Sequence, residues 1–299
     1  MDFRYVSAGS SRSHTTRFFS FVPGSAWNTL LAVKLGSPAD LWKPLRGAAD
    51  ALLSVVFPTP CRICRQPLST AGRVPVCSAC LDSLRRIRGA VCPQCGRPQP
   101  PVVAPARLCH GCARGVYHFD LARSFALYDD AMVRLLTLLK YEPVAPLGAW
   151  FAAQIEQVIR AEPALGEVDF IVPVPLDRRR FRERGYNQAE LIAQPLARQL
   201  GRPLARDLLV RLRSRPPRLK LSQRERWETV RGAFHAPAGP RVDTSRILLV
   251  DDVLTSGATL DACARALRSA GAAAVHAVTV ARVLPRWQSP VSGTTSDGI

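Results

Sequence analysis

Hydrophobic and polar positions follow strand and helix periods in turn from about residue 119 onward, most clearly over residues 246–281. The continuous apolar run 247–250 predicts a strand buried on both faces of a parallel sheet. Apolar residues at helical spacing over 260–270 predict a helix, and Gly271 is placed to end it in the left-handed conformation. Residues 275–281 predict the next strand. The pattern therefore predicts an α/β domain with a parallel sheet flanked by helices.

Other elements of this domain follow from the same kind of pattern. Residues 169–175 indicate another buried strand, which ends in prolines. Asn187, with a glutamate three residues later, has the form of a capping box, so a helix begins there, and Pro195 is expected to bend it. Asp130 is expected to cap a further helix that ends at Lys140–Tyr141.

The segments outside this domain differ in composition. Residues 1–57 begin with a stretch rich in Ser, Arg and Thr and end with apolar residues at helical spacing, which indicates a loosely ordered arm plus a short amphipathic helix. Proline, glycine and cysteine dominate residues 58–118. Residues 285–299 are rich in Ser, Thr and Gly and are expected to be a disordered tail. The α/β domain is therefore expected to span residues 119–284.

Eight of the nine cysteines form four Cys-x-x-Cys pairs, and the last two pairs repeat the first two at an offset of 31 or 32 residues. Two such turns complete a tetrahedral shell of four thiolates around a zinc ion. We therefore expect two structural zinc ions, with no open coordination position for catalysis. The proposed metal ligands are Cys61, Cys64, Cys77, Cys80, Cys92, Cys95, Cys109 and Cys112.

Other interpretations of the cysteines fit less well. A disulfide scaffold needs an oxidising compartment, which nothing in the sequence indicates. A thioredoxin-like site needs one Cys-x-x-Cys motif in a βαβ unit and not four in a tandem repeat. His110 lies next to Cys109 and is an alternative ligand to one thiolate, although a spectator role fits better. The ninth cysteine, Cys263, lies in the predicted apolar helix face and is expected in the core.

The net charge of +18 favours polyanionic partners: nucleic acid, a membrane surface or phosphate-rich small molecules. Only four of the basic residues are lysines, so the surplus of arginine also fits a coding bias. The apolar segment 48–57 is too short for a membrane span and contains Asp50, and no convincing signal-peptide cleavage site follows the segment 18–33. We expect a cytoplasmic protein without a membrane span.

The strand 247–250 leads into two acids, Asp251 and Asp252, and then into residues 253–259, which are mostly small or carry hydroxyl groups. Ligands of α/β folds bind at the carboxyl ends of the strands. Backbone N–H groups at a helix N-terminus bind phosphate. The two carboxylates would repel a phosphate, so they fit a sugar cis-diol with a magnesium ion nearby. A P-loop is excluded because the chain has no Gly-x-x-x-x-Gly-Lys-Ser/Thr sequence.

The segment 251–259 resembles the motif of type I phosphoribosyltransferases that binds phosphoribosyl pyrophosphate (PRPP). With the preceding cysteine repeats, residues 57–284 resemble the ComF/GntX family: a double zinc ribbon followed by a type I phosphoribosyltransferase-like parallel sheet flanked by helices. The resemblance implies that Asp251 and Asp252 hold the ribose hydroxyls of PRPP, with magnesium. It implies that one loop binds the 5′-phosphate and consists of Thr255, Ser256, Gly257, Ala258 and Thr259. It implies that a second loop binds the pyrophosphate and contains Pro173, Val174 and Pro175.

The arginine-rich segments carry a further part of the resemblance. The sequence Arg-Gly-x-Asn-Gln at residues 184–188 is characteristic of the family, and residues 206–231 fit a loop that closes over substrate or a groove for single-stranded nucleic acid. Three residues depart from the family pattern. Ser256 replaces a threonine but keeps the hydroxyl, whereas Arg218 and Thr229 replace Gln and Asn. Arg218 and Thr229 therefore weaken the inference that residues 206–231 have the function of the family's loop.

Two classes of function remain open. One is phosphoribosyl transfer, in which pyrophosphate leaves C1′ of PRPP and an unidentified acceptor takes its place; no assignable general base is present in the sequence. The other is a non-catalytic protein that binds or processes single-stranded DNA and uses the fold to sense PRPP or a nucleotide. The family resemblance implies DNA uptake during transformation, with DNA-uptake proteins as partners. The sequence leaves the oligomeric state open.

Overall fold

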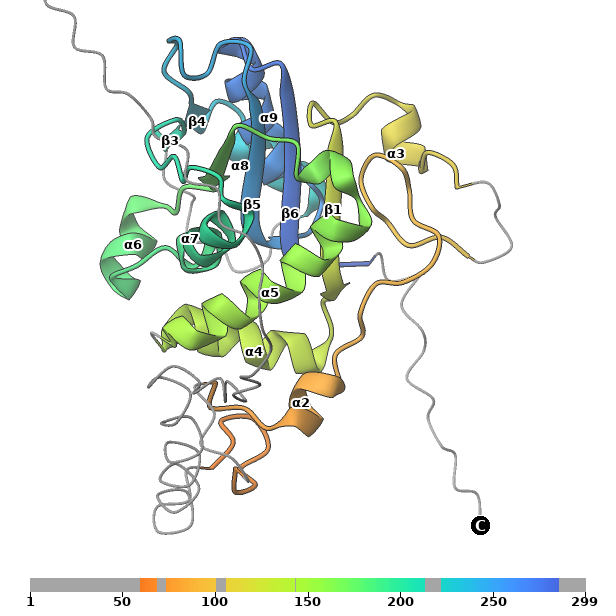
Figure 1. The fold of residues 1–299 in the computed structure, drawn as a ribbon. Helices are drawn as coiled ribbons and strands as arrows, with labels where there is room; N and C mark the ends of the chain where they lie inside the picture. The colour runs from red at the N-terminus through yellow and green to blue at the C-terminus, as the bar shows by residue number, and fades with distance from the viewer. Residues whose placement is uncertain (1–59, 69–73, 101–105, 143, 213–221, 285–299) are drawn as a thin grey trace, which may run out of the picture. The chain divides into compact units, whose positions relative to one another are not determined.

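A computed structural model gives the architecture of the cysteine module and the α/β domain (Figure 1). The arm and helix expected in 1–57 and the tail expected in 285–299 lie outside the described residues. The structure describes residues 60–68, 74–100, 106–142, 144–212 and 222–284, which belong to one compact unit.

The cysteine module contains two short helices, and the remaining elements form the α/β domain. In chain order the elements are α2 (Ser78–Asp82), α3 (His110–Ala113), β1 (Leu121–Leu127), α4 (Asp130–Tyr141), α5 (Ala145–Ala161), η1 (Pro163–Leu165), β2 (Phe170–Pro173), α6 (Arg178–Arg184), α7 (Gln188–Leu200), β3 (Val210–Arg211), α8 (Gln223–Val230), β4 (Phe234–His235), β5 (Arg246–Leu254), α9 (Ala258–Ser269) and β6 (Ala274–Arg282).

The described part of the α/β domain is built on a four-stranded parallel sheet with the strand order β1-β6-β5-β2. Val250 of β5 aligns with Pro173 of β2 on one side and with Val278 of β6 on the other. The strands predicted from apolar runs therefore lie side by side, and the predicted crossover from β5 through α9 to β6 is confirmed. A parallel sheet flanked by helices is the fold class expected from the sequence.

Helices cover both faces of the sheet, and neighbouring residues of β5 pack into different layers. Ile247 and Leu249 pack in one apolar cluster with Cys263 of α9. Leu248 and Val250 pack in the other cluster, with residues of α4, α5 and α7. All five side chains are fully buried, and each large aliphatic one contributes about 1.5–3 kcal/mol to stability. The alternation sends the side chains of successive strand residues to opposite faces.

The ends of the crossover elements differ slightly from the prediction. β5 continues through the two acids to Leu254, because Leu254 still pairs with Arg282 of β6. α9 begins at Ala258, directly after Gly257, which has a φ of +85°. At the other end of α9, Gly271 has a φ of +104°, and its N–H donates to the carbonyl oxygen of Arg268 at 3.0 Å. This end has the left-handed glycine that the sequence predicts.

Two other predicted helix starts are close to the observed ones. The side chain of Asn187 accepts a hydrogen bond from the N–H of Ala189 and caps α7, as predicted. Glu190, whose position suggests a capping box with Asn187, forms an ion pair with Arg206. α4 is capped by Asp129 and not by the predicted Asp130, because Asp129 is the residue with extended backbone that precedes the first helical turn.

The arginine-rich segments contain more regular structure than the sequence suggests. The run of arginines after β2 forms the helix α6, none of whose residues is buried. Residues 206–231 were expected to form a long polar loop or groove. The described part of this segment includes β3 and α8, and α8 begins with a capping box between Ser222 and Glu225.

Short segments cover both outer strands of the sheet. On the β1 side, the N–H of Ile87 donates to the carbonyl oxygen of Phe125, and the N–H of Ala122 donates to that of Gln94. On the β2 side, the N–H of Ile171 donates to the carbonyl oxygen of Pro203. Among the described residues, none of the helices has the length and apolar character needed to cross a membrane.

Candidate functional site

The eight paired cysteines come together as two groups of four. The four sulfur atoms of each group lie within 4.8 Å of one another. In the first group Cys64 Sγ lies 3.6 Å from Cys77 Sγ, and in the second Cys95 Sγ lies 3.6 Å from Cys109 Sγ. Each group therefore joins two consecutive Cys-x-x-Cys pairs. The first group is Cys61, Cys64, Cys77 and Cys80, and the second is Cys92, Cys95, Cys109 and Cys112.

These distances fit a tetrahedral zinc site. Zn–S bonds of about 2.3 Å require sulfur atoms about 3.8 Å apart, and the observed separations are 3.6 and 4.0 Å. A disulfide would bring two sulfurs to about 2.05 Å, and none of the nine cysteines, all of which lie in the described residues, forms a disulfide. His110 is exposed and belongs to neither group. The cysteine clusters therefore support structural zinc in both halves of the module.

The predicted ribose-binding acids lie at the carboxyl end of β5 and face different layers. Asp252 is 8% exposed, and one of its carboxylate oxygens lies 2.7 Å from the Nζ of Lys140 at the end of α4. Asp251 follows the residues of β5 that face α9, and its carboxylate accepts a hydrogen bond from the N–H of Asp252 at 2.8 Å. The sequence pattern predicts only that Lys140 lies at a helix end. Lys140 is one of only four lysines in an arginine-rich chain, and this rarity is the one feature of the sequence that could have pointed to a role for it.

The electrostatics of this pair disfavour two negative charges in the absence of a ligand. Burial is the largest cause that raises the pKa of Asp251 well above its ordinary value, and the Asp252 carboxylate is the second. The Lys140 ammonium acts in the opposite direction and lowers this pKa. Arg211 of β3 lies within electrostatic range of Asp251. The Arg211 guanidinium is 4.0 Å from Asp177 and packs over the ring of Phe234. Burial lowers the pKa of Arg211, and Asp177 opposes that shift.

The predicted phosphate loop lies between the end of β5 and the N-terminus of α9. Thr255 is exposed, Ser256 and Thr259 are half-buried, and Gly257 and Ala258 are buried. The hydroxyl of Ser256 accepts a long hydrogen bond of 3.5 Å from the N–H of Ala258. The loop thus leads directly into the positive end of a helix dipole, with hydroxyl groups beside it, which suits an anion.

The predicted pyrophosphate loop lies at the same edge of the sheet. The N–H of Val174 donates to the carbonyl oxygen of Val250 at 2.9 Å, so Pro173–Pro175 lie directly beside the strand that carries the two acids. Asn187 holds this loop from the other side, because its side-chain amide donates to the carbonyl oxygen of Val174 at 3.0 Å. The Arg-Gly-x-Asn-Gln motif therefore supports the loop through its asparagine.

Tyr117, which no sequence pattern marks as a site residue, contacts the predicted phosphate loop directly. Its hydroxyl donates to the carbonyl oxygen of Ser256 at 3.0 Å, and its ring stacks on Phe119 and Trp227. Burial raises the pKa of Tyr117 to about 12, so the hydroxyl stays protonated at neutral pH. Tyr117 and Ser256 are 139 residues apart in the chain, and no local pattern links them.

Comparisons with known proteins agree with this architecture. The family described as "Double zinc ribbon domain" matches residues 52–113, and the family described as "Phosphoribosyl transferase domain" matches residues 187–294.

Several relatives match over most of the chain. DNA utilization protein YhgH of Salmonella typhimurium is 32% identical over 233 residues, which are 77% of this chain and 100% of the relative. Competence protein ComFC of Bacillus subtilis is 32% identical over 69% of this chain and 84% of the relative. Competence protein F of Haemophilus influenzae is 26% identical over 74% of this chain and 96% of the relative. Because the first match extends over the whole relative and the two matched domains stand in the order expected from the sequence, the chain belongs to the ComF/GntX family.

Proposed function

We propose that this protein binds PRPP, or a nucleotide with the same ribose 5-phosphate group, together with Mg²⁺ at the carboxyl edge of β5, and that it acts in the use of DNA taken up by the cell. One observation carries the binding proposal. The two acids, the hydroxyl-bearing loop before α9 and the Pro173–Pro175 loop all lie at one edge of the parallel sheet. The role in DNA use rests on the names of the relatives, a DNA utilization protein and a competence protein.

Each part of this edge suits one group of the proposed ligand. The carboxylates of Asp251 and Asp252 accept hydrogen bonds from the two ribose hydroxyls. The N–H groups at the start of α9 and the hydroxyls of Ser256 and Thr259 bind the 5′-phosphate. Asp251 and Asp252 are the residues at this edge that could hold magnesium with the ligand, and the ion would supply positive charge there. The repulsion between the two acids then decreases, which favours binding over the ligand-free state.

A calorimetric titration of PRPP with Mg²⁺ tests this proposal. The wild-type protein is expected to bind, and the double variant Asp251→Asn/Asp252→Asn is expected to lose binding. The matched control Asp207→Asn/Glu228→Gln removes the same amount of charge from exposed positions and is expected to bind normally. A wild-type protein that shows no binding at millimolar PRPP would refute the proposal.

Turnover is a separate proposal. We infer that bound PRPP is poised to release pyrophosphate, because the two loops would hold its two ends while the acids lie near the positive charge that develops at C1′. The experiment is the detection of pyrophosphate and of a phosphoribosylated product with a panel of nitrogenous bases. If PRPP binds but no base yields a product, the fold serves as a binding platform in this protein.

A second candidate function, binding of single-stranded DNA, is favoured by the charge of the chain. The net charge is +18, and the arginines of α6 before Arg184 are exposed. Each phosphate contact contributes about −0.7 to the slope of log affinity against log salt concentration. The variant Arg180→Gln/Arg182→Gln is expected to flatten this slope, whereas the control Arg198→Gln/Arg202→Gln, on and after α7, is expected to leave it unchanged. A wild-type slope near zero would exclude this function.

A further inference from the structure

The two zinc ribbons differ in what they contact. The first cluster packs through Cys61 against the layer of α4 and α5, and Arg62 forms an ion pair with Glu142. The second cluster packs through Cys92 and Cys95 in the opposite layer, which also contains Ala258 and Cys263 of α9. Only the second cluster is therefore seated in the layer that contains the start of the helix after the phosphate loop, as far as the described residues show.

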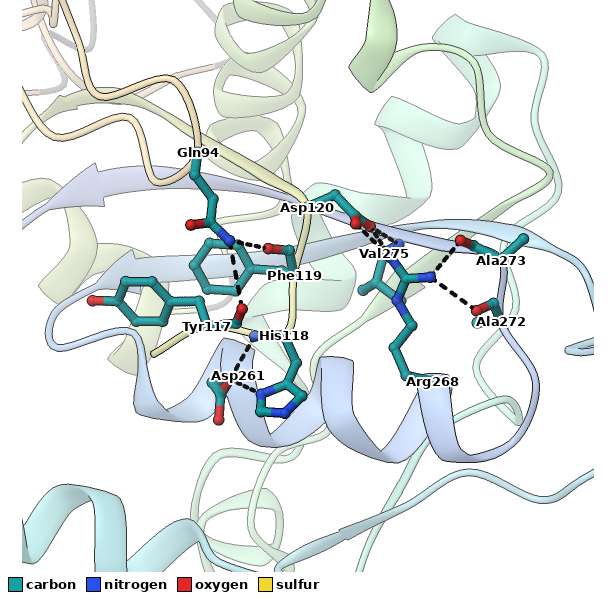
Figure 2. Close-up of polar contacts among 10 residues, drawn as sticks. All are labelled: Gln94, Tyr117, His118, Phe119, Asp120, Asp261, Arg268, Ala272, Ala273 and Val275. Atoms are coloured by element: carbon teal, nitrogen blue, oxygen red, sulfur yellow. Dashed lines mark hydrogen bonds and ion pairs between the residues drawn. The ribbon is translucent and has the colours of Figure 1, made fainter. Parts of the chain in front are cut away.

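The turn between Cys92 and Cys95 is fastened to the sheet by Gln94 and by a buried arginine. The side-chain amide of Gln94 donates to the carbonyl oxygen of Phe119 at 2.9 Å and reaches that of Tyr117 at 3.5 Å (Figure 2). Arg282, at the end of β6, is only 2% exposed, donates to the carbonyl oxygen of Cys95 and lies 3.4 Å from its sulfur. The metal-binding turn thus fixes the backbone of residues 117–119.

Residues 117 and 118 in turn hold the phosphate loop and the first turn of α9. Besides the bond from the Tyr117 hydroxyl to Ser256, both the backbone N–H and the ring Nδ1 of His118 lie within 2.9 Å of the Asp261 carboxylate (Figure 2). A Cβ atom at Gly257 would come within 2.5 Å of the Tyr117 ring, so the ring lies directly against the loop backbone. Through these contacts, residues 117 and 118 connect the Cys92–Cys95 turn to the phosphate loop and to the first turn of α9.

We propose that the second zinc ribbon is a structural part of the phosphate site, with Tyr117 as the positioning residue between the metal cluster and the loop. This inference rests on the proposed function for its ligand. Metal binding at the second cluster holds residues 117–119, and these residues hold the Ser256–Gly257 turn in the conformation that binds phosphate. The first cluster, which lies in the other layer, has no such effect on the loop.

The tandem repeat offers a matched pair of variants, Cys77→Ser and Cys109→Ser. Each cysteine precedes a short helix, and each is half-buried. The N–H of Cys77 donates to Cys61 Sγ at 3.4 Å, and the N–H of Cys109 donates to Cys92 Sγ at 3.3 Å. The two substitutions therefore remove the same ligand from equivalent sites. Each is expected to lower the zinc content from about two ions to about one per chain.

The readouts are hydrogen–deuterium exchange in the full-length protein and PRPP binding. Cys109→Ser is expected to speed exchange over residues 253–261 by about tenfold or more and to weaken PRPP binding, whereas Cys77→Ser leaves both unchanged. Equal exchange over residues 253–261 in the two variants would overturn the inference. If the wild type does not bind PRPP, the proposed function fails. The exchange comparison still tests whether the second cluster positions the loop.

A second substitution keeps the metal and tests the contact itself. Tyr117→Phe retains the ring and removes the hydroxyl, so exchange over residues 253–261 is expected to rise by about threefold to tenfold at normal zinc content. The control is Tyr186→Phe, because the Tyr186 hydroxyl also donates to a backbone carbonyl, that of Leu139, at 3.0 Å. An unchanged exchange rate in Tyr117→Phe would show that the hydroxyl does not position the loop.

Discussion

Replacing Gly257 by alanine tests how tightly Tyr117 packs against the phosphate loop. Gly257 has a φ of +85°, which costs an L-residue roughly 1–2 kcal/mol. The new Cβ would also lie 2.5 Å from Tyr117 Cε1 and 3.1 Å from its Cζ, which forces the ring or the loop to move. Overpacking of this kind costs about 1–3 kcal/mol. Gly257→Ala is therefore expected to lower the free energy of unfolding by about 2–5 kcal/mol.

Urea denaturation of matched variants separates the two costs. Gly201 has a φ of +62°, and a Cβ there would meet no described atom within 4 Å, so Gly201→Ala is expected to show the conformational cost alone, about 1–2 kcal/mol. In a Tyr117→Ala background, Gly257→Ala is expected to cost no more than that, which gives a coupling of about 1–3 kcal/mol in the double-mutant cycle. Equal losses in Gly257→Ala and Gly201→Ala, or a coupling near zero, would refute the packing argument.

Two other predictions concern the acids and the second metal cluster. Because burial and Asp252 raise the pKa of Asp251 above its ordinary value of 3.8, the folded state loses stability as the pH rises past that value. Asp251→Asn is thus expected to raise the free energy of unfolding of the ligand-free protein at pH 7 and to flatten its pH dependence in urea denaturation as the pH rises above 3.8; a less stable variant would contradict this. Arg282→Met removes a buried cation beside Cys95 and is expected to cost about 3–5 kcal/mol in unfolding free energy and to speed the loss of one zinc ion per chain to a chelator. Zinc loss at the wild-type rate would show that the arginine does not stabilise the cluster.

Features with a local pattern could be predicted from the sequence. Paired cysteines at short spacing define the two clusters, and the apolar run before Asp251 defines the buried strand. The helical stripe through Cys263 and the glycine at position 271 define α9 and its end. Cys263 is fully buried, as expected of a core residue, and burial raises the pKa of its thiol well above the ordinary value. In each case the information lies within about ten to thirty residues of chain.

Features that depend on distant contacts or on exposed surfaces could not be predicted. Arg282 and Cys95 are 187 residues apart, and in the sequence Arg282 is only the last residue of a strand. Arg211 approaches Asp251 through β3, a strand of two residues that has no detectable period. The helix α6 has no buried residue, so its arginine-rich sequence contains no apolar stripe. The positions of these side chains follow from the assembled sheet and not from their neighbours in the chain.

The backbone pairing along β1 limits the access of another chain to this outer strand. An outer strand with free N–H and carbonyl groups is a template onto which another copy can add a strand. Here two segments of the cysteine module occupy that position. The N–H of Ile87 donates to the carbonyl oxygen of Phe125, and the N–H of Ala122 donates to that of Gln94. Because Gln94 lies between two cysteines of the second cluster, the metal that shapes this turn also keeps part of the outer strand closed to intermolecular β-pairing. Loss of the metal from the second cluster is therefore expected to open part of this edge to a strand from another copy of the chain.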